Sequence, residues 1–372
     1  MLDPNGNCGP SAGTWTKGIT YWVCGSDTEY RWTCTRNTTG TGTLTIKKAT
    51  ASSHGTDTGW QSAYGTKQAI WNGIRINTTN VTIDGQTGSG TSGHGFKFIS
   101  TPTAEINKLV DLPAGEEHSS FTLQYAEMTS RTVPIQNGCI DAGTCMSEAI
   151  GLRRTDAKAG QTYSFTNLYI HDVAGPIQME SGTTNPLSTI TMDGLYIVRN
   201  DDTEAHHSAC ITFGALSDTV TMKNSWLQDC WGTAVITCTT GGTYTAHSNW
   251  NFYNNVFLWS TGFAYSNPSG IKLLGSTGAH SNLNFYSNTF VNRATAPAGN
   301  IFANLEIVAG ATWTGVNVKN NLFYSAPATG FYAQHSTTSG ITVDDNSYYQ
   351  TTHNDENGHV AGSASPFTNH LS

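Results

Sequence analysis

The carboxylates and histidines of the sequence are densest in one stretch, RNDDTEAHHSAC at residues 199–210. Carboxylates this close repel one another unless a cation or a protein partner neutralises them. Carboxylate oxygens are the ligands that Ca²⁺ prefers. Asp201, Asp202 and Glu204 are therefore candidate Ca²⁺ ligands, and His206 and His207 are candidate substrate contacts. The alternative interpretation is a solvated acidic loop that holds no metal.

A second carboxylate, Glu180, ends the short apolar run PIQME just upstream. Glycoside hydrolases use two carboxyl groups, ~5–5.5 Å apart in retaining enzymes and ~6.5–9.5 Å apart in inverting ones. Glu180 with Asp201 or Asp202 could supply either pair. A hydrolase is thus one hypothesis for this protein.

The elements that position these residues repeat along the chain. An asparagine two places before an aromatic or apolar residue recurs in NNVF, SNTF and NNLF, at Asn255, Asn288 and Asn321, 33 residues apart each time. The same frame continues to four further positions, namely Asn167, Gly194, Asn224 and Asn346. A period of this length indicates a solenoid, a propeller or an array.

Each period contains three short runs with strand alternation, such as GIKLLG, NLNFYS and TFVN. Three strands in one period predict a coil, because a propeller blade needs four strands and a longer repeat. The asparagine tolerates a left-handed backbone at a tight bend. Its amide can bond to its counterparts ~4.8 Å away along the coil. We expect the aromatic residue two places on to point inward and stack.

Through these repeats, residues 70–350 resemble the right-handed parallel β-helix proteins of the pectate-lyase-like superfamily. The segments TLTIKKAT and GIRINTTNVTIDGQ resemble the entry rungs of secreted polysaccharide-processing members. The resemblance implies an all-β, right-handed parallel β-helix of about nine to eleven rungs. We expect residues 1–70 to form an N-terminal cap and entry strands, 71–350 the β-helix, and 351–372 a C-terminal tail.

The resemblance also implies that substrate lies along the first strand of each rung. We assign GIRI, GFKFI, IGLRR, PIQME and GIKLL to such first strands, and alternation then directs one set of polar side chains outward. This strip includes Arg75, Lys97, Arg153, Gln178 and Lys272. Its four cations favour an acidic polysaccharide, with Arg75, Lys97, Arg154, Gln178, His206 and His207 as substrate-binding candidates.

Family lyases cleave uronate polymers by β-elimination, using Ca²⁺ or cations to neutralise the carboxylate and Arg or Lys as the base. By this resemblance Arg153, Lys272 and Glu180 are the catalytic candidates. Arg153 lies one rung from Glu180, whereas Lys272 lies three rungs away, ~14 Å. The sequence thus favours a polysaccharide lyase over the hydrolase. The long segments at 101–120 and 130–148 are expected to be loops that form the walls of its cleft.

A non-enzymatic role is the third hypothesis. Repeats, caps and a Thr/Asn-rich surface also suit an adhesin, a phage fibre or a self-assembling extracellular filament subunit. Such a protein would bind a glycan or another protein chain.

Composition limits the partners and the compartment. Only 12% of the 372 residues are charged, so Thr, Ser, Asn and Gly must form much of the surface, which is typical of extracellular β-proteins. The net charge of −8 argues against nucleic acid as a partner. Eight cysteines without zinc-site spacing predict disulfides and secretion, although the spacing does not reveal their pairing. No apolar run reaches ~18 residues, so no membrane span is expected.

Overall fold

The computed structural model describes most of the repeat region and parts of both ends. The described residues are 14–31, 37–89, 92–100, 107–114, 118–131, 146–154, 160–181, 187–200, 209–214, 217–237, 247–261, 269–274, 279–293, 302–307, 312–325, 331–336, 340–349 and 359–360.

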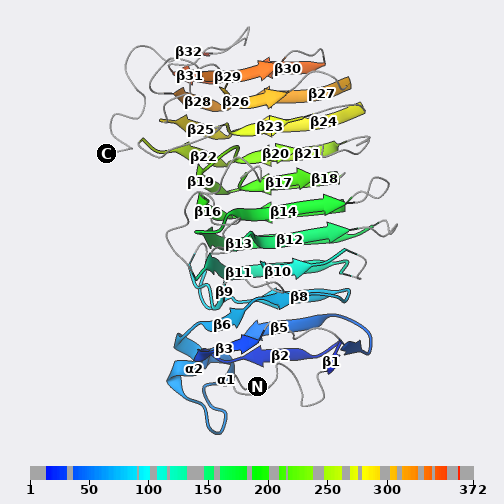
Figure 1. Cartoon of the computed structure of the whole chain (residues 1–372), viewed down its shortest axis with the longest axis vertical. Helices are drawn as coiled ribbons and strands as arrows, with labels where there is room; N and C mark the ends of the chain where they lie inside the picture. The colour runs from blue at the N-terminus through cyan, green and yellow to red at the C-terminus, as the bar shows by residue number, and fades with distance from the viewer. Residues whose placement is uncertain are drawn as a thin grey trace.

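Parallel strands form three stacks that run the length of the molecule (Figure 1). Sheet 1 consists of β7 (Ile74–Arg75), β10 (Lys108–Leu112), β12 (Glu148–Arg154), β14 (Gly175–Ser181), β17 (Ile211–Gly214), β20 (Val235–Thr237), β23 (Ile271–Leu273), β26 (Phe302–Ile307) and β29 (Phe331–Ser336). Sheet 2 consists of β2 (Thr20–Val23), β5 (Leu44–Lys48), β8 (Val81–Asp84), the first halves of β11 (Phe121–Ser130) and β13 (Thr162–His171), β15 (Leu187–Asp193), β18 (Ser217–Lys223), β21 (Ser248–Tyr253), β24 (Ala279–Tyr286), β27 (Thr312–Lys319) and β30 (Ile341–Asp344). Sheet 3 consists of β3 (Ser26–Arg31), β6 (Ala69–Asn72), β9 (Phe96–Ser100), the second halves of β11 and β13, β16 (Tyr196–Asn200), β19 (Trp226–Cys230), β22 (Val256–Trp259), β25 (Thr289–Asn292), β28 (Leu322–Ser325), β31 (Ser347–Tyr349) and β32 (His359–Val360).

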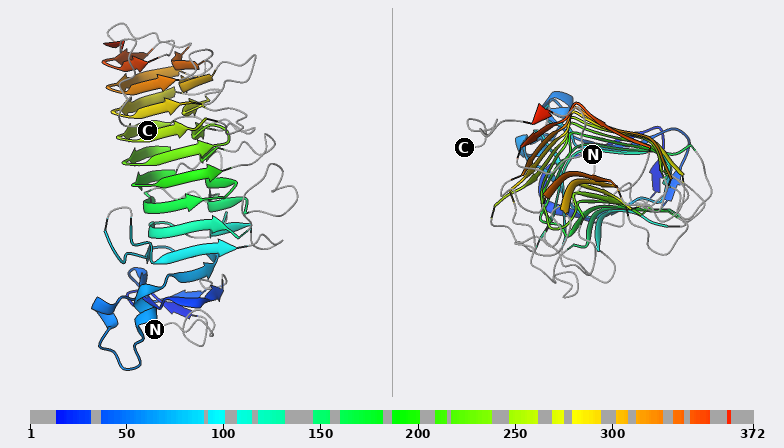
Figure 2. Two further views of the ribbon diagram at one scale, coloured as in Figure 1. Left: turned by 90° about the vertical axis from the view of Figure 1, so that its left-hand side faces the viewer. Right: turned by 90° about the horizontal axis from the view of Figure 1, so that it is seen from above.

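The chain visits the three sheets in turn and then begins the next rung. After β14, β15 and β16, for example, β17 pairs in parallel with β14, β18 with β15, and β19 with β16. Seen along the long axis, the strands of successive rungs superpose (Figure 2). The predicted parallel β-helix is confirmed. The described strands, nine in sheet 1 and eleven in sheet 2, agree with the expected number of rungs.

The N-terminal part adds two short helices and one separate strand pair. The helices α1 (Ala51–His54) and α2 (Ser62–Thr66) lie between β5 and β6, and β1 (Thr14–Thr16) pairs with β4 (Asn37–Thr39). Among the described residues, no helix is long and apolar enough to cross a membrane. Of the predicted tail at 351–372, the structure describes β32 alone, which pairs with β31.

At the bend between sheets 2 and 3, one residue turns the chain and the next residue is buried and bonds along the coil. Asn254, Ser287, Asn320 and Asp345 have positive φ values of 54° to 56°. The residue after each is a buried asparagine: Asn255, Asn288, Asn321 and Asn346. The prediction that one asparagine both bends the chain and bonds along the coil was therefore wrong. Asn167, Gly194 and Asn224 also have positive φ. They therefore occupy the bend position, like Asn254, and not the buried position that follows it.

The buried asparagines form a continuous ladder of amide hydrogen bonds. Asn255 Nδ2 donates to Asn288 Oδ1 at 3.0 Å. In the next two rungs, Asn288 Nδ2 donates to Asn321 Oδ1 at 3.1 Å, and Asn321 Nδ2 donates to Asn346 Oδ1 at 3.0 Å. Two residues further on, Phe257, Phe290, Phe323 and Tyr348 stack inside the coil, with ring centroids 4.8 to 5.5 Å apart. The predicted inward stacking is confirmed.

A disulfide joins Cys210, just before β17, to Cys230 at the end of β19. The bond confirms the prediction of disulfides for two of the eight cysteines, and it supplies one pairing that spacing did not reveal. Both cysteines are fully buried in the core.

Replacing both cysteines with serine (Cys210→Ser/Cys230→Ser) is expected to lower the free energy of unfolding by roughly 3 kcal/mol, because the bond closes a loop of 20 residues in the unfolded chain. Urea unfolding of the oxidised protein and of the double variant measures this loss. The double variant should be insensitive to reductant at this site. Equal unfolding midpoints for the two proteins would contradict the prediction.

Candidate active site on sheet 1

The outer face of sheet 1 lies between the longest connections of the coil. From β15 onward, two residues join each strand of sheet 2 to the next strand of sheet 3. Connections to sheet 1 are mostly longer: residues 201–210 precede β17, and residues 238–247 follow β20. Binding and catalytic residues concentrate on long loops held by a rigid scaffold. The outer face of sheet 1 is therefore the candidate location of a functional site.

Arg153 connects two carboxylates on this face. It lies in register with Glu180 on the neighbouring strand β14, and Glu148 begins its own strand, β12. Arg153 Nη2 lies 2.6 Å from Glu148 Oε1, and Arg153 Nε lies 2.8 Å from Glu180 Oε2. The Glu148 side chain is 10% exposed, whereas that of Glu180 is 51% exposed. One guanidinium thus holds a buried and an exposed carboxyl group side by side.

Gly151 leaves the space in which Glu148 lies. A Cβ at this position would lie 2.3 Å from Glu148 Oε2 and 2.3 Å from Lys108 Cδ, so no larger residue fits without moving these side chains. Glu148 Oε2 is buried and has no hydrogen-bond partner in the described part of the chain. A buried carboxyl oxygen without a donor is stabilised by binding a proton rather than by carrying charge.

Burial and neighbouring charges shift the pKa values of Glu148 and Arg153. Burial raises the pKa of Glu148, assisted by the charge of Glu180, and this outweighs the opposing effects of Lys108 and Arg153. The short contact with Arg153 does not reverse the rise in the pKa of Glu148, because Arg153 also binds Glu180. Burial would lower the pKa of Arg153, but the two carboxylates together raise it.

The role of base predicted for Arg153 therefore conflicts with its surroundings. A general base must lose its proton near the working pH. The hydrogen bonds that Arg153 donates to Glu148 and Glu180 instead stabilise the charged guanidinium. Arg153 is better suited to neutralising a negative charge.

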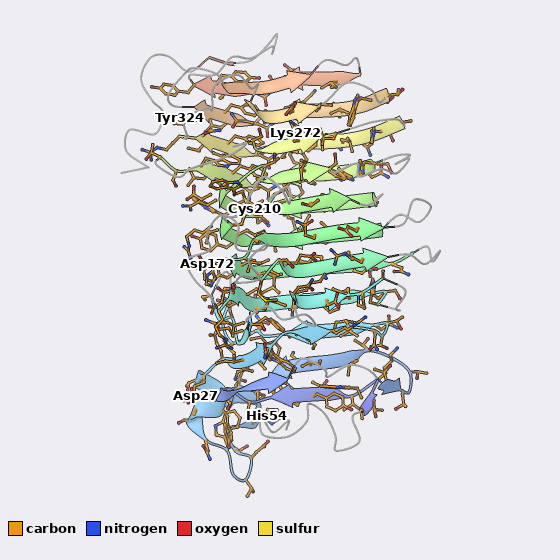
Figure 3. All side chains as sticks on the ribbon, in the orientation of Figure 1. Asp27, His54, Asp172, Cys210, Lys272 and Tyr324 are labelled. Atoms are coloured by element: carbon orange, nitrogen blue, oxygen red, sulfur yellow. A yellow bond between two sulfur atoms is a disulfide. The ribbon has the colours of Figure 1, made fainter. Side chains whose placement is uncertain are left out.

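Two other cations of sheet 1, Arg75 and Lys272, also pair with carboxylates. Arg75 lies 3.7 Å from Asp111, and Lys272 lies 2.9 Å from Glu306. The sequence argument for a polyanion rested on four cations along one strip, and the pairing of two of them with carboxylates weakens it. Lys272 (Figure 3) lies on β23, four strands from Arg153 and so ~19 Å away. Gln178 lies on β14, in register with Gly151 and close to the Arg153 cluster.

Lys97 is not on sheet 1, contrary to the prediction, because its strand β9 belongs to sheet 3. There its Nζ lies 2.6 Å from Glu127 Oε1. His171 contacts Glu127 at 3.3 Å and Asp172 at 2.6 Å, and Arg199 binds Asp172 through two nitrogens. Burial would raise the pKa of Glu127, but hydrogen bonds from its neighbours lower it to about 2. This is a separate network in which each charge has an opposite partner.

The remaining predicted residues lie outside the described part of the chain. These are Asp201, Asp202, Glu204, His206 and His207, together with the side chain of Arg154. The predicted Ca²⁺ site therefore stays a prediction. Elsewhere, the described residues contain no group of three or more His, Cys, Asp or Glu side chains that could hold a metal ion.

Sequence reasoning missed Glu148, Lys108 and Asp111. It placed residues 101–120 and 130–148 in loops, but Lys108–Leu112 is strand β10 of sheet 1, and Glu148 begins β12. The signal for β10 was the short apolar run KLVDL, bounded by polar and proline residues. The signal for Glu148 was its place directly before the apolar run AIGL.

No protein-family model matches the chain, and no curated protein does either. Among solved structures, it is similar to the GH136 lacto-N-biosidase from Eubacterium ramulus, with 9% identity, a TM-score of 0.37 and 86% of this chain covered. It is also similar to the PL6 family alginate lyase AlyGC, with 12% identity, a TM-score of 0.33 and 94% of this chain covered. The chain spans 61% and 50% of the lengths of these two proteins. Its own strand pairings place it among the parallel β-helix proteins.

Proposed function

We propose that this protein is a secreted carbohydrate-active enzyme that hydrolyses a polysaccharide along the outer face of sheet 1. The observation that carries the proposal is the pair Glu148 and Glu180, held side by side by Arg153. Glycoside hydrolysis needs one carboxyl group that keeps its proton and one that is ionised. Burial raises the pKa of Glu148, as a proton donor requires, and Glu180 is the exposed carboxyl group beside it. The buried disulfide supports an oxidising, extracellular compartment.

The roles follow from the two environments. Glu148, whose pKa is raised by burial, donates its proton to the glycosidic oxygen as the bond to the anomeric carbon breaks. Glu180 faces solvent beside it, so it either attacks the anomeric carbon or removes a proton from the attacking water. Arg153 orients both carboxyl groups through its contacts with Glu148 and Glu180.

The polysaccharide lyase favoured by the sequence is the second candidate. The observation in its favour is the charged guanidinium of Arg153, which is 27% exposed and could neutralise a uronate carboxylate. Asp201, Asp202 and Glu204 would add Ca²⁺ for the same purpose, since oxygen donors suit this ion.

The products distinguish these candidates. On a panel of alginate, pectate, glycosaminoglycan and neutral glucans, we expect reducing ends to form without the ultraviolet absorbance of an unsaturated uronate. The rate should be the same with chelator, because neither Glu148 nor Glu180 needs a metal to transfer a proton. Unsaturated product would establish the lyase instead. Absence of any product on every polymer would favour an adhesin or filament subunit.

The pH dependence tests the assignment of the acid. Because the pKa of Glu148 is raised above its ordinary 4.5, the proton donor persists to higher pH and is lost as pH rises through the folded-state value. We expect kcat/KM to fall on this alkaline limb. The Glu148→Gln variant should retain a low rate without that limb. An unchanged alkaline limb in the variant would assign it to another group.

A further inference from the structure

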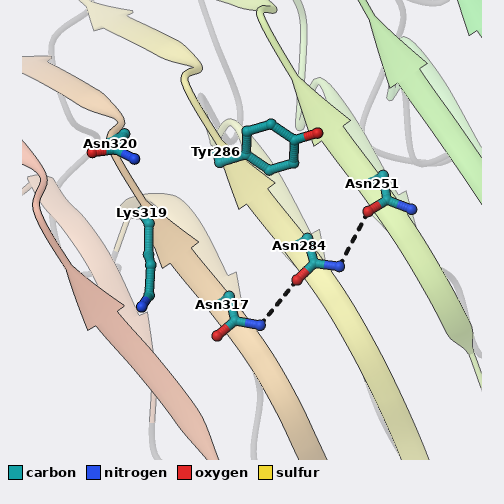
Figure 4. Close-up of a pocket in the computed structure, with 6 residues that line it drawn as sticks. All are labelled: Asn251, Asn284, Tyr286, Asn317, Lys319 and Asn320. Carbon is teal, nitrogen blue, oxygen red and sulfur yellow. Dashed lines mark hydrogen bonds between the residues drawn. The ribbon is translucent and has the colours of Figure 1, made fainter.

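The outer face of sheet 2 contains a hollow toward the C-terminal end of the coil, far from the Arg153 cluster in sequence and on a different sheet. Its volume is about 450 Å³. Figure 4 shows the side chains that line it. Strands β21, β24 and β27 and the residues that follow β27 line it. The lining side chains are Asn251, Asn284, Asn317, Asn320, Tyr286 and Lys319.

Three of these asparagines form a row across successive rungs. Asn284 Nδ2 donates to Asn251 Oδ1 at 3.1 Å and to Asn282 Oδ1 at 3.2 Å. Asn317 Nδ2 donates to Asn284 Oδ1 at 2.9 Å and to Gly315 O at 3.3 Å. A primary amide has two N–H donors and an oxygen that accepts twice. The two amide N–H groups of Asn284 and Asn317 are thus already used, and only their amide oxygens can accept further hydrogen bonds.

The row therefore presents hydrogen-bond acceptors at the spacing of the rungs, ~4.8 Å. An extended peptide does not match this spacing, because its N–H groups on one side recur only every ~6.7 Å. A pyranose unit in an extended 1,4-linked chain is about as long as one rung is high. Hydroxyl groups of successive sugars can therefore donate to successive asparagines.

An aromatic ring and a cation complete the hollow. Tyr286 is 37% exposed and stacks on Tyr253 with the ring centroids 5.0 Å apart. Burial and the neighbouring phenol raise the pKa of Tyr286, so it stays a neutral donor. Lys319 forms no ion pair with any residue that the structure describes, in contrast to Arg75 and Lys272 on sheet 1. Asp344 lies in register with Lys319 on β30 but makes no salt bridge with it, so a carboxylate on the ligand can bind Lys319.

We infer that this hollow is a second carbohydrate-binding surface, which takes an extended acidic polysaccharide chain lying along the coil axis. The chain's hydroxyl groups donate to the oxygens of Asn251, Asn284 and Asn317, and a uronate carboxylate binds Lys319. The surface holds polymer without cleaving it, since no carboxyl group is among the described residues that line it. It does not depend on the hydrolysis proposed for sheet 1.

Affinity electrophoresis in gels that contain alginate or polygalacturonate tests this inference. We expect the wild-type chain to be retarded in at least one acidic gel and not in hydroxyethyl cellulose. Tyr286→Ala, Lys319→Gln and Asn284→Val should each weaken the apparent affinity at least tenfold. The matched control is Tyr196→Ala, because Tyr196 is a tyrosine of similar exposure, 40%, on sheet 3. Thermal unfolding should confirm that the variants are folded.

The Glu148→Gln variant keeps this test separate from the proposed function. It should lose most of its hydrolysis but keep the retardation, because Glu148 lies on sheet 1. Wild-type migration that no acidic polymer slows would overturn the inference, as would equal retardation of the sheet 2 variants and wild type. Retardation that only sheet 1 variants abolish would also overturn it, while leaving the hydrolase proposal intact.

Discussion

Replacing Glu148 with glutamine is expected to lower kcat by roughly 10²–10⁴-fold, the usual contribution of a general acid. Glutamine has nearly the same shape and can still accept a hydrogen bond from Arg153, but it has no acidic proton to give to the leaving oxygen. Reducing-end assays on the polymer identified by the product screen measure the loss. KM should change little, because the missing interaction belongs to the transition state.

The matched control is Glu306→Gln. Glu306 lies on the same sheet and is paired with a cation, Lys272, but it is five strands from Glu148 along the coil. We expect its variant to keep nearly full activity. Wild-type activity in Glu148→Gln would remove Glu148 from the mechanism. A similar loss in both variants would indicate that the charge balance of the whole face matters rather than one proton donor.

The fold could be predicted from the sequence because its determinants are local and repeated. The asparagine before each strand of sheet 3 and the aromatic residue two places on recur in every late rung, and each contacts its own counterpart one turn away. The separate roles of neighbours such as Asn254, which bends the chain, and Asn255, which bonds along the coil, were not predicted. Both positions hold asparagine, and sequence alone does not show which residue has the left-handed backbone.

The site could be predicted in part. Arg153 and Glu180 end similar apolar runs, so their register across β12 and β14 could be anticipated. Lys97 was misplaced because strand alternation shows which side chains point outward but not which of three sheets a strand joins. Glu148 was missed because its position depends on an arginine that reaches back five residues and on the space above Gly151. Such contacts arise only once the strands are paired.

Replacing Asn288 with alanine is expected to lower the free energy of unfolding by about 4 kcal/mol, more than the loss of the disulfide. The Asn288 side chain is 1% exposed and takes part in four hydrogen bonds. Its oxygen accepts from both the backbone N–H and the amide of Asn255. Alanine would leave both donors buried without a partner, at ~1–3 kcal/mol each. Urea unfolding followed by circular dichroism measures the change.

Asn317→Ala provides the comparison, because it removes the same kind of amide bond from a ladder that faces solvent. Asn317 donates to Asn284 at 2.9 Å, close to the distances in the buried ladder, but its side chain is only partly buried. Water can replace the lost partner there, so we expect a loss below ~1 kcal/mol. Equal losses at the two positions would mean that the amide contacts themselves stabilise the coil. A much larger loss at Asn288 would show that the buried ladder is retained because its donors have no alternative partner inside the coil.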